Sequence, residues 1–119
     1  MDCLFCKIAD GSVPSRKVFE DDRVVVFHDI QPQAPVHLLV IPRKHIATLH
    51  DASPEDAELL GHALLAARRA AEEAGLAESG YRVINNCGQD AGQVVYHLHL
   101  HVLGGEKLGG LNPRQPSAE

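Results

Sequence analysis

Short runs of apolar and β-branched residues alternate with turn-forming segments along the chain. Such runs predict strands, and we expect them at residues 17–20, 24–29, 37–41, 81–86 and 94–103, the last being the longest. Pro42 follows the third run, and Gly104 and Gly105 end the fifth. The order, mostly strands with one main helix between them, predicts an α+β domain with an antiparallel sheet.

The one long helix is predicted between the third and fourth strands. Ser53 can cap its start, Pro54 suits the first helical position, and small apolar residues recur at helical spacing over residues 60–74. Gly75 then provides a natural end. A short helix is expected at residues 3–10, closed by Gly11.

Length and charge narrow the classes of function. A chain of 119 residues favours one domain, and its net charge of −5 lacks the clustered lysine and arginine that bind nucleic acid polymers. No apolar run approaches the ~20 residues of a membrane span, so we expect no membrane partner. Residues 1–3 do not begin a signal peptide pattern, which favours a cytoplasmic protein.

Three histidines alternate with leucines at the run His97-Leu98-His99-Leu100-His101. Because side chains alternate between the two faces of a strand, the three imidazoles should share one face. A wet polar face, a metal trio and a catalytic array all remain open from this pattern alone. Imidazole can attack phosphorus directly, and a second histidine can then protonate a leaving group or hold phosphoryl oxygens.

The cysteines form a second candidate site. Cys3 and Cys6 make a C-x-x-C pair, while Cys87 stands alone and suits a small buried hydrophobe. Metal binding, a redox pair and two structural thiols are all consistent with this spacing in a reducing compartment.

The histidine run resembles the signature of the histidine triad (HIT) family, in which three histidines alternate with apolar residues. The surrounding text resembles the Hint branch, the nucleoside phosphoramidate hydrolases, in residues 19–22, 27–35, 37–42, 44–46 and 92–96. The similarity extends from about residue 3 to residue 105, nearly the whole chain.

The resemblance implies a fold and a reaction. The fold would be a five-stranded antiparallel sheet with one long and one or two short helices, forming a HIT domain at residues 1–107 with a C-terminal tail at 108–119. Two subunits would join their sheets into a ten-stranded one in a homodimer. The reaction would be attack on the α-phosphate of purine nucleoside 5′-phosphoramidates or acyl-adenylates, which releases AMP through a nucleotidyl-histidine intermediate.

The resemblance also implies the residues of the site. The middle histidine, His99, would be the nucleophile, His101 would bind phosphoryl oxygen, and His37 would support the triad by hydrogen bonding. Asp29 would accept the ribose hydroxyls, as suits an acceptor-only carboxylate. The positions near the phosphate are Asn86, Gly92, Gln93 and Val94, and those lining an apolar base pocket are Leu4, Phe5, Ile8, Phe27, Ile30 and Leu39.

Several bacterial members of the family bind zinc through such a C-x-x-C pair. The ligands implied here are Cys3, Cys6, His45 and His97, a closed tetrahedral set that suits a structural Zn²⁺. The metal would then occupy His97 and leave the other two histidines of the run for chemistry, for which no cofactor is required.

Two departures from the family pattern leave other functions open. Many relatives carry serine where this chain has Val94, so no hydroxyl is available there for the leaving group. The tail also lacks the tryptophan of animal relatives. A dinucleoside polyphosphate hydrolase and a zinc-stapled nucleotide-binding regulatory protein are the alternative functions.

Overall fold

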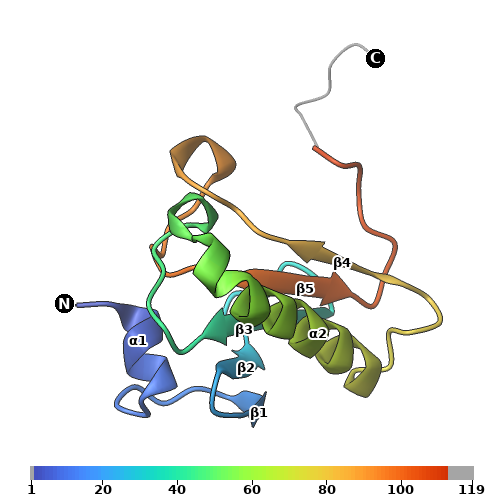
Figure 1. The fold of residues 1–119 in the computed structure, drawn as a ribbon. Coiled ribbons are helices and arrows are strands. Elements are labelled where there is room, and N and C mark those ends of the chain that lie inside the picture. Colours follow the sequence, from blue (N-terminus) through green and yellow to red (C-terminus); the bar gives the residue numbers. More distant parts are fainter. Residues whose placement is uncertain (1, 113–119) are drawn as a thin grey trace.

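Five antiparallel strands form one sheet with the spatial order β1-β2-β3-β5-β4. The structure is a computed structural model and describes residues 2–112 (Figure 1). The strands are β1 (Lys17–Glu20), β2 (Val24–His28), β3 (Val36–Pro42), β4 (Tyr81–Ile84) and β5 (Leu100–Gly104). The predicted fold class is thereby confirmed for the single chain, because one sheet accompanies one long helix.

The neighbouring strands β2 and β3 are buried on both faces, which explains their nearly continuous apolar sequence. Val24 and Val26 of β2 pack under the long helix, whereas Val25 and Phe27 point to the opposite face. The alternation in β3 is the same, and both strands therefore contribute to two apolar clusters. One cluster supports the long helix and the other supports the N-terminal helix.

The helices cover opposite faces of the sheet (Figure 1). The long helix α2 (Ala57–Glu73) presents small buried residues to the sheet, as the alanine spacing predicted. The short 3₁₀ turn Pro54–Asp56 precedes it, and Asp56 Oδ2 accepts the Ser53 N–H at 3.0 Å. The N-terminal helix α1 (Leu4–Ala9) is capped by Cys3, whose Sγ accepts the Cys6 N–H at 3.3 Å.

Further 3₁₀ turns lie at Leu49–Asp51 and Gln89–Ala91. Within residues 2–112, no helix is long and apolar enough to cross a membrane.

The predicted long strand at residues 94–103 is wrong in its first half. The strand β5 begins only at Leu100, and the segment before it leaves the sheet. Its backbone joins the loop after β3 instead, because the Leu98 N–H donates to the Ile46 carbonyl at 2.6 Å. The Gln93 side chain also donates to the carbonyls of Ala47 and Val95, at 2.9 and 3.0 Å. These contacts between distant segments replace the ladder that the apolar alternation suggested.

Smaller differences concern the strand ends and the tail. The second strand ends at His28 and the fourth at Ile84, whereas the predictions extended them to residues 29 and 86. The predicted domain boundary at residue 107 stays a prediction, and residues 113–119 of the predicted tail lie outside the described part of the chain.

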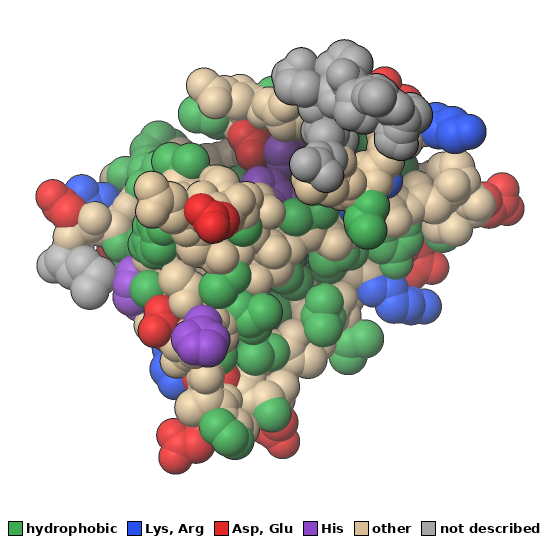
Figure 2. All heavy atoms as spheres, turned by 90° about the horizontal axis from the view of Figure 1, so that it is seen from above, with side chains coloured by type: hydrophobic (Ala, Val, Ile, Leu, Met, Phe, Trp, Pro, Cys, Tyr) green, Lys and Arg blue, Asp and Glu red, His purple; other side chains and the backbone are tan. Residues whose placement is uncertain are grey.

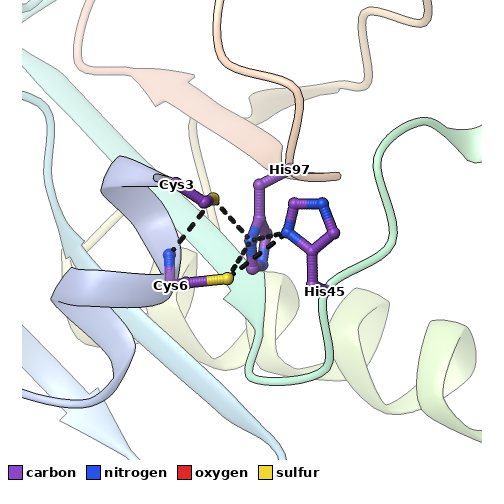
Figure 3. Close-up of side chains that lie close together, drawn as sticks. All are labelled: Cys3, Cys6, His45 and His97. Atoms are coloured by element: carbon purple, nitrogen blue, oxygen red, sulfur yellow. Dashed lines mark hydrogen bonds between the residues drawn. The ribbon is translucent and has the colours of Figure 1, made fainter. Parts of the chain in front are cut away.

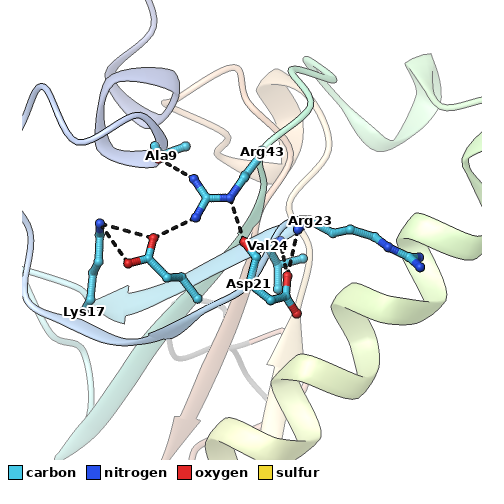
Figure 4. Close-up of polar contacts among 7 residues, drawn as sticks. Ala9, Lys17, Asp21, Arg23, Val24 and Arg43 are labelled. Carbon is cyan, nitrogen blue, oxygen red and sulfur yellow. Dashed lines mark hydrogen bonds and ion pairs between the residues drawn. The ribbon is translucent and has the colours of Figure 1, made fainter.

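Arg43, directly after β3, joins the N-terminal helix to the turn between β1 and β2 (Figure 4). Its guanidinium donates to the Ala9 carbonyl, to the Asp21 carbonyl at 2.8 Å and to Glu20 Oε1 at 2.7 Å. The planar fork of arginine can make all of these bonds at once, which lysine cannot do. The side chain therefore fixes α1, and with it one wall of the cavity described below, against the sheet.

We expect Arg43→Ala to destabilise the fold by about 2 kcal/mol, because two backbone carbonyls lose a charged donor. Thermal and urea unfolding measure the change. Arg68→Ala is the control, since Arg68 is exposed and its ion pair with Glu72 is 3.7 Å long. Equal stability of both variants would contradict this role of Arg43.

Candidate functional site

A cavity of about 590 Å³ lies between α1, the ends of β2 and β3, and the segment before β5. Figure 2 shows histidine side chains in a hollow on the face seen there. The lining includes every residue that the sequence predicted for catalysis or nucleotide binding. These are His37, His99, His101, Asp29, Asn86, Gly92, Gln93, Val94, Leu4, Phe5, Ile8, Phe27, Ile30 and Leu39.

The walls of the cavity differ in their chemistry. Phe5 and Phe27 stack edge to face with ring centres 5.6 Å apart, and Phe5 also meets the His99 ring at 5.1 Å. Ile30 and Val94 lie at the rim, where they are 93% and 86% exposed. The cavity thus has an apolar slot at one end and histidines at the other.

One ring nitrogen of His99 is fixed by a hydrogen bond to the backbone. Its Nδ1 lies 2.7 Å from the carbonyl oxygen of His97. A carbonyl oxygen only accepts, so Nδ1 carries the proton and donates. In the neutral ring, Nε2 therefore keeps its lone pair, which is the state that a nucleophilic nitrogen needs.

The proton positions of His37 and His101 follow in the same way. The Gln33 N–H donates to His37 Nδ1 at 3.0 Å, so the proton of the neutral His37 ring is on Nε2. This Nε2 lies 2.8 Å from His101 Nδ1 and donates to it. The proton of His101 is consequently on Nε2, where it is a donor for an anionic group. Asp29 Oδ2 is also 3.4 Å from His37 Nε2.

Four side chains from three parts of the chain form a second cluster beside the cavity (Figure 3). Cys3 Sγ lies 3.3 Å from His97 Nδ1, and Cys6 Sγ lies 3.3 Å from His45 Nδ1. The two imidazole Nδ1 atoms are 3.3 Å apart. The predicted metal ligands therefore converge, with one potential ligand atom each within 4.8 Å of the others.

The geometry of this cluster fits a tetrahedral metal ion. Around a zinc ion, with Zn–N of about 2.1 Å and Zn–S of about 2.3 Å, ligand atoms lie roughly 3.3–3.8 Å apart. His97 Nε2 donates to the Pro42 carbonyl at 2.7 Å, which leaves Nδ1 free to bind a metal. Cys3, Cys6, His45 and His97 could thus hold a metal ion.

Asp29, His37 and His101 also bring one potential ligand atom each within 4.8 Å of one another. The separation of 2.8 Å between its two ring nitrogens is that of a hydrogen bond and is shorter than the roughly 3.3 Å expected around zinc. We therefore assign this group to the hydrogen-bonded pair of His37 and His101.

Comparison with known families decides which proteins share this arrangement. The family model of the HIT domain matches residues 10–108. The chain belongs to the HIT family. The resemblance inferred from the histidine run is thereby confirmed, and the five-stranded sheet with its cavity is the HIT fold.

Relatives of this HIT protein are similar over nearly their whole length. The chain is 47% identical over 106 residues to the purine nucleoside phosphoramidase of Escherichia coli strain K12. The aligned region covers 89% of each protein. It is similar to a HIT family hydrolase from Legionella pneumophila, with 52% identity, a TM-score of 0.89 and coverage of 91% and 96%. A histidine triad protein from Clostridium difficile gives 49% identity, a TM-score of 0.90 and coverage of 94% and 97%.

Sequence reasoning missed several residues of the HIT site. His28 and Ser15 both line the cavity, although no sequence pattern indicated either residue. Asn85 was also overlooked, although its side-chain amide donates to the His99 carbonyl at 3.0 Å. No sequence pattern pointed to Asn85, because the residue reaches the His99 carbonyl only where β4 ends, at Ile84.

Burial controls the protonation of the histidines in the HIT site. Burial, together with the neighbouring His99 and His37 rings, lowers the pKa of His101 to about 4, although Asp29 opposes the shift. Burial also lowers the pKa of His37 and outweighs the opposing charge of Asp29. Both rings are therefore neutral at pH 7, as their hydrogen bond requires.

The depressed pKa of His101 predicts a pH dependence of stability. The unfolded chain takes up this proton near the ordinary pKa of 6.5, whereas the folded chain takes it up only near pH 4. His101 therefore contributes stability above pH 6.5 that is lost as the pH falls toward 4. We expect the melting temperature to fall more between pH 7 and pH 5 in the parent than in His101→Gln. The cluster of Cys3, Cys6, His45 and His97 is the same in both proteins, so its titration cancels in the comparison. An equal fall of the melting temperature in both proteins would contradict this account.

Proposed function

We propose that this HIT protein is a nucleotidyl hydrolase that releases AMP from purine nucleoside 5′-phosphoramidates or acyl-adenylates. The observation that carries the proposal is the hydrogen bond from His99 Nδ1 to the His97 carbonyl, which leaves a lone pair on Nε2 in a nucleotide-sized cavity. The similarity to the purine nucleoside phosphoramidase of Escherichia coli supports phosphoramidates as the substrate class.

The nucleoside would occupy the apolar end of the cavity. Phe5, Phe27 and Leu39 are buried there and offer flat or aliphatic surfaces to a purine. Asp29 would accept the ribose hydroxyls. One of its oxygens already accepts the Gln31 N–H at 2.8 Å, which holds the carboxylate in place and leaves further lone pairs free.

In the first step, Nε2 of His99 would attack the α-phosphorus. A bond forms between Nε2 and phosphorus, and the bond from phosphorus to the leaving group breaks. The leaving group departs with that electron pair and takes a proton from water at the cavity mouth, because Val94 has no hydroxyl to supply one. His101 Nε2–H would donate to a phosphoryl oxygen as charge develops on it.

In the second step, water would attack the phosphorus of nucleotidyl-His99 and give one proton to solvent, which balances the hydroxide left when the leaving group was protonated. The P–N bond breaks, its electron pair returns to Nε2, and AMP is released. His37 would keep His101 in the same tautomer throughout, because its Nε2–H occupies His101 Nδ1.

We propose that the ion held by Cys3, Cys6, His45 and His97 is zinc in a structural role. Two thiolates and two imidazoles complete a tetrahedral shell and leave no open position for substrate. When bound, zinc would tie the N-terminal segment to the segment before β5 and so support one wall of the cavity.

We also propose that the protein forms a homodimer. The strand β4 is at an edge of the sheet, and its Tyr81 and Val83 are 39% and 37% exposed. Leu64 and Leu65 of α2 are 54% and 64% exposed. A second copy that pairs along β4 would cover apolar side chains and unpaired backbone groups together.

We expect His99→Ala to lose at least about a thousandfold in kcat on an adenosine phosphoramidate, because the attacking atom is removed. Steady-state kinetics measure this loss, and nucleotide affinity should change little. Full activity in His99→Ala would exclude this nucleophile. Faster turnover of diadenosine polyphosphate by the parent would favour the alternative substrate class, and nucleotide binding without any turnover would favour a regulatory protein.

We expect about one zinc ion per chain, and a melting temperature about 10 °C or more lower once a chelator removes it. Elemental analysis and calorimetry measure both quantities. Cys6→Ala should lose the metal, whereas the matched control Cys87→Ala should retain it, since Cys87 is outside the cluster. Metal retained by Cys6→Ala, or another metal found in its place, would contradict the proposal.

A further inference from the structure

Asn85 lies behind the proposed nucleophile and contacts its backbone. Its Nδ2 donates to the carbonyl oxygen of His99 at 3.0 Å. The acceptor-only carbonyl identifies the facing atom as the nitrogen, so the oxygen Oδ1 must point elsewhere. This Oδ1 is buried and has no hydrogen-bond partner within residues 2–112.

The contact occurs where the sheet ends. In the ladder between β4 and β5, Ile84 is paired with His101, and β4 stops at that residue. The His99 carbonyl is therefore beyond the last rung, at a point where no main-chain donor of β4 is supplied. The Asn85 side chain provides the missing donor and extends the ladder toward the histidines.

The buried oxygen of Asn85 carries a cost. A buried acceptor without a partner has lost its hydrogen bond to water and gained nothing in return. An apolar side chain of similar shape would avoid this cost but would leave the His99 carbonyl without its donor. The benefit of asparagine at this position consequently rests on its bond to His99.

We propose that Asn85 is a positioning residue for His99, an inference that rests on the proposed role of His99 as nucleophile. The His99 residue is then held at two points, its carbonyl by Asn85 and its ring by the His97 carbonyl. With the first bond removed, the backbone at residue 99 can rotate, and the ring loses its fixed hydrogen bond to His97. Attack on phosphorus slows because reacting atoms must be held in a narrow range of positions.

Asn85→Leu tests the proposal, because leucine has the same branched arrangement of heavy atoms as asparagine but cannot donate. We expect the melting temperature to change little, because removal of the unpaired Asn85 oxygen offsets the loss of the donor to the His99 carbonyl, while kcat on the phosphoramidate falls about tenfold and KM changes less than twofold. Leu76→Ala is the control for general destabilisation, since Leu76 packs in the cluster under α2, away from the cavity. It should lower the melting temperature and leave kcat within twofold of the parent at 20 °C or below.

Asn85→Asp is a second variant, which keeps the size of the side chain and removes the donor. It also tests the proposal if Asn85→Leu fails to fold. It should show at least the same loss of kcat. A kcat within twofold of the parent in either folded variant would overturn the proposal. A second outcome would also overturn it: Asn85→Leu loses both kcat and melting temperature, while Asn85→Asp keeps the kcat of the parent.

A spectroscopic measurement separates this proposal from the proposed function. Nitrogen-15 correlation spectra of the imidazoles should show His99 in the single tautomer with Nδ1–H in the parent and in both tautomers in Asn85→Leu. If the parent turns over no phosphoramidate, the proposed function fails, and these spectra still decide whether Asn85 positions the ring. One unchanged tautomer in parent and variant would overturn the positioning role.

Discussion

The hydrogen bond from the His99 ring to the His97 carbonyl is the interaction on which the rest of the site depends. It fixes the tautomer of His99 and sets the direction of its free nitrogen. The His97 carbonyl that accepts it precedes β5 and is outside the paired ladder of the sheet. The irregular segment before β5 is therefore the part of the chain that holds the proposed nucleophile in one tautomer.

The same short segment connects the cavity to the metal cluster. The side chain of His97 belongs to the cluster, its carbonyl holds His99, and the next backbone N–H bonds to Ile46, directly after His45. Small displacements at the cluster would therefore reach the proposed nucleophile through one residue. Through this arrangement the proposed structural ion would influence the proposed nucleophile although the cluster is outside the cavity.

The features that depend on local sequence were predictable. The existence of β2 and β3, the turn at Ser53 and Pro54 that leads into the long helix, and the shared face of His99 and His101 all follow from residues close together in the chain. The convergence of the C-x-x-C pair with two distant histidines was predicted only because the family resemblance supplied the partners. Spacing alone left a redox pair equally open.

The features that depend on contacts between distant segments were not predictable. The apolar alternation over residues 94–103 indicated one long strand, and only the loop at residues 45–47 shows why the chain departs from it. The roles of Arg43 and Asn85 likewise depend on backbone groups far away in sequence, whose positions no local pattern encodes.

The most direct test of this account is to find the atom that receives the nucleotide. The protein is mixed with a slowly hydrolysed adenosine phosphoramidate, quenched at neutral pH and digested, and the peptides are mapped by mass spectrometry. The account predicts one added AMP group, less water, on the peptide containing residues 97–101, with fragmentation placing it on His99. Turnover with the AMP group on another residue, or with no covalent adduct at any time, would contradict it.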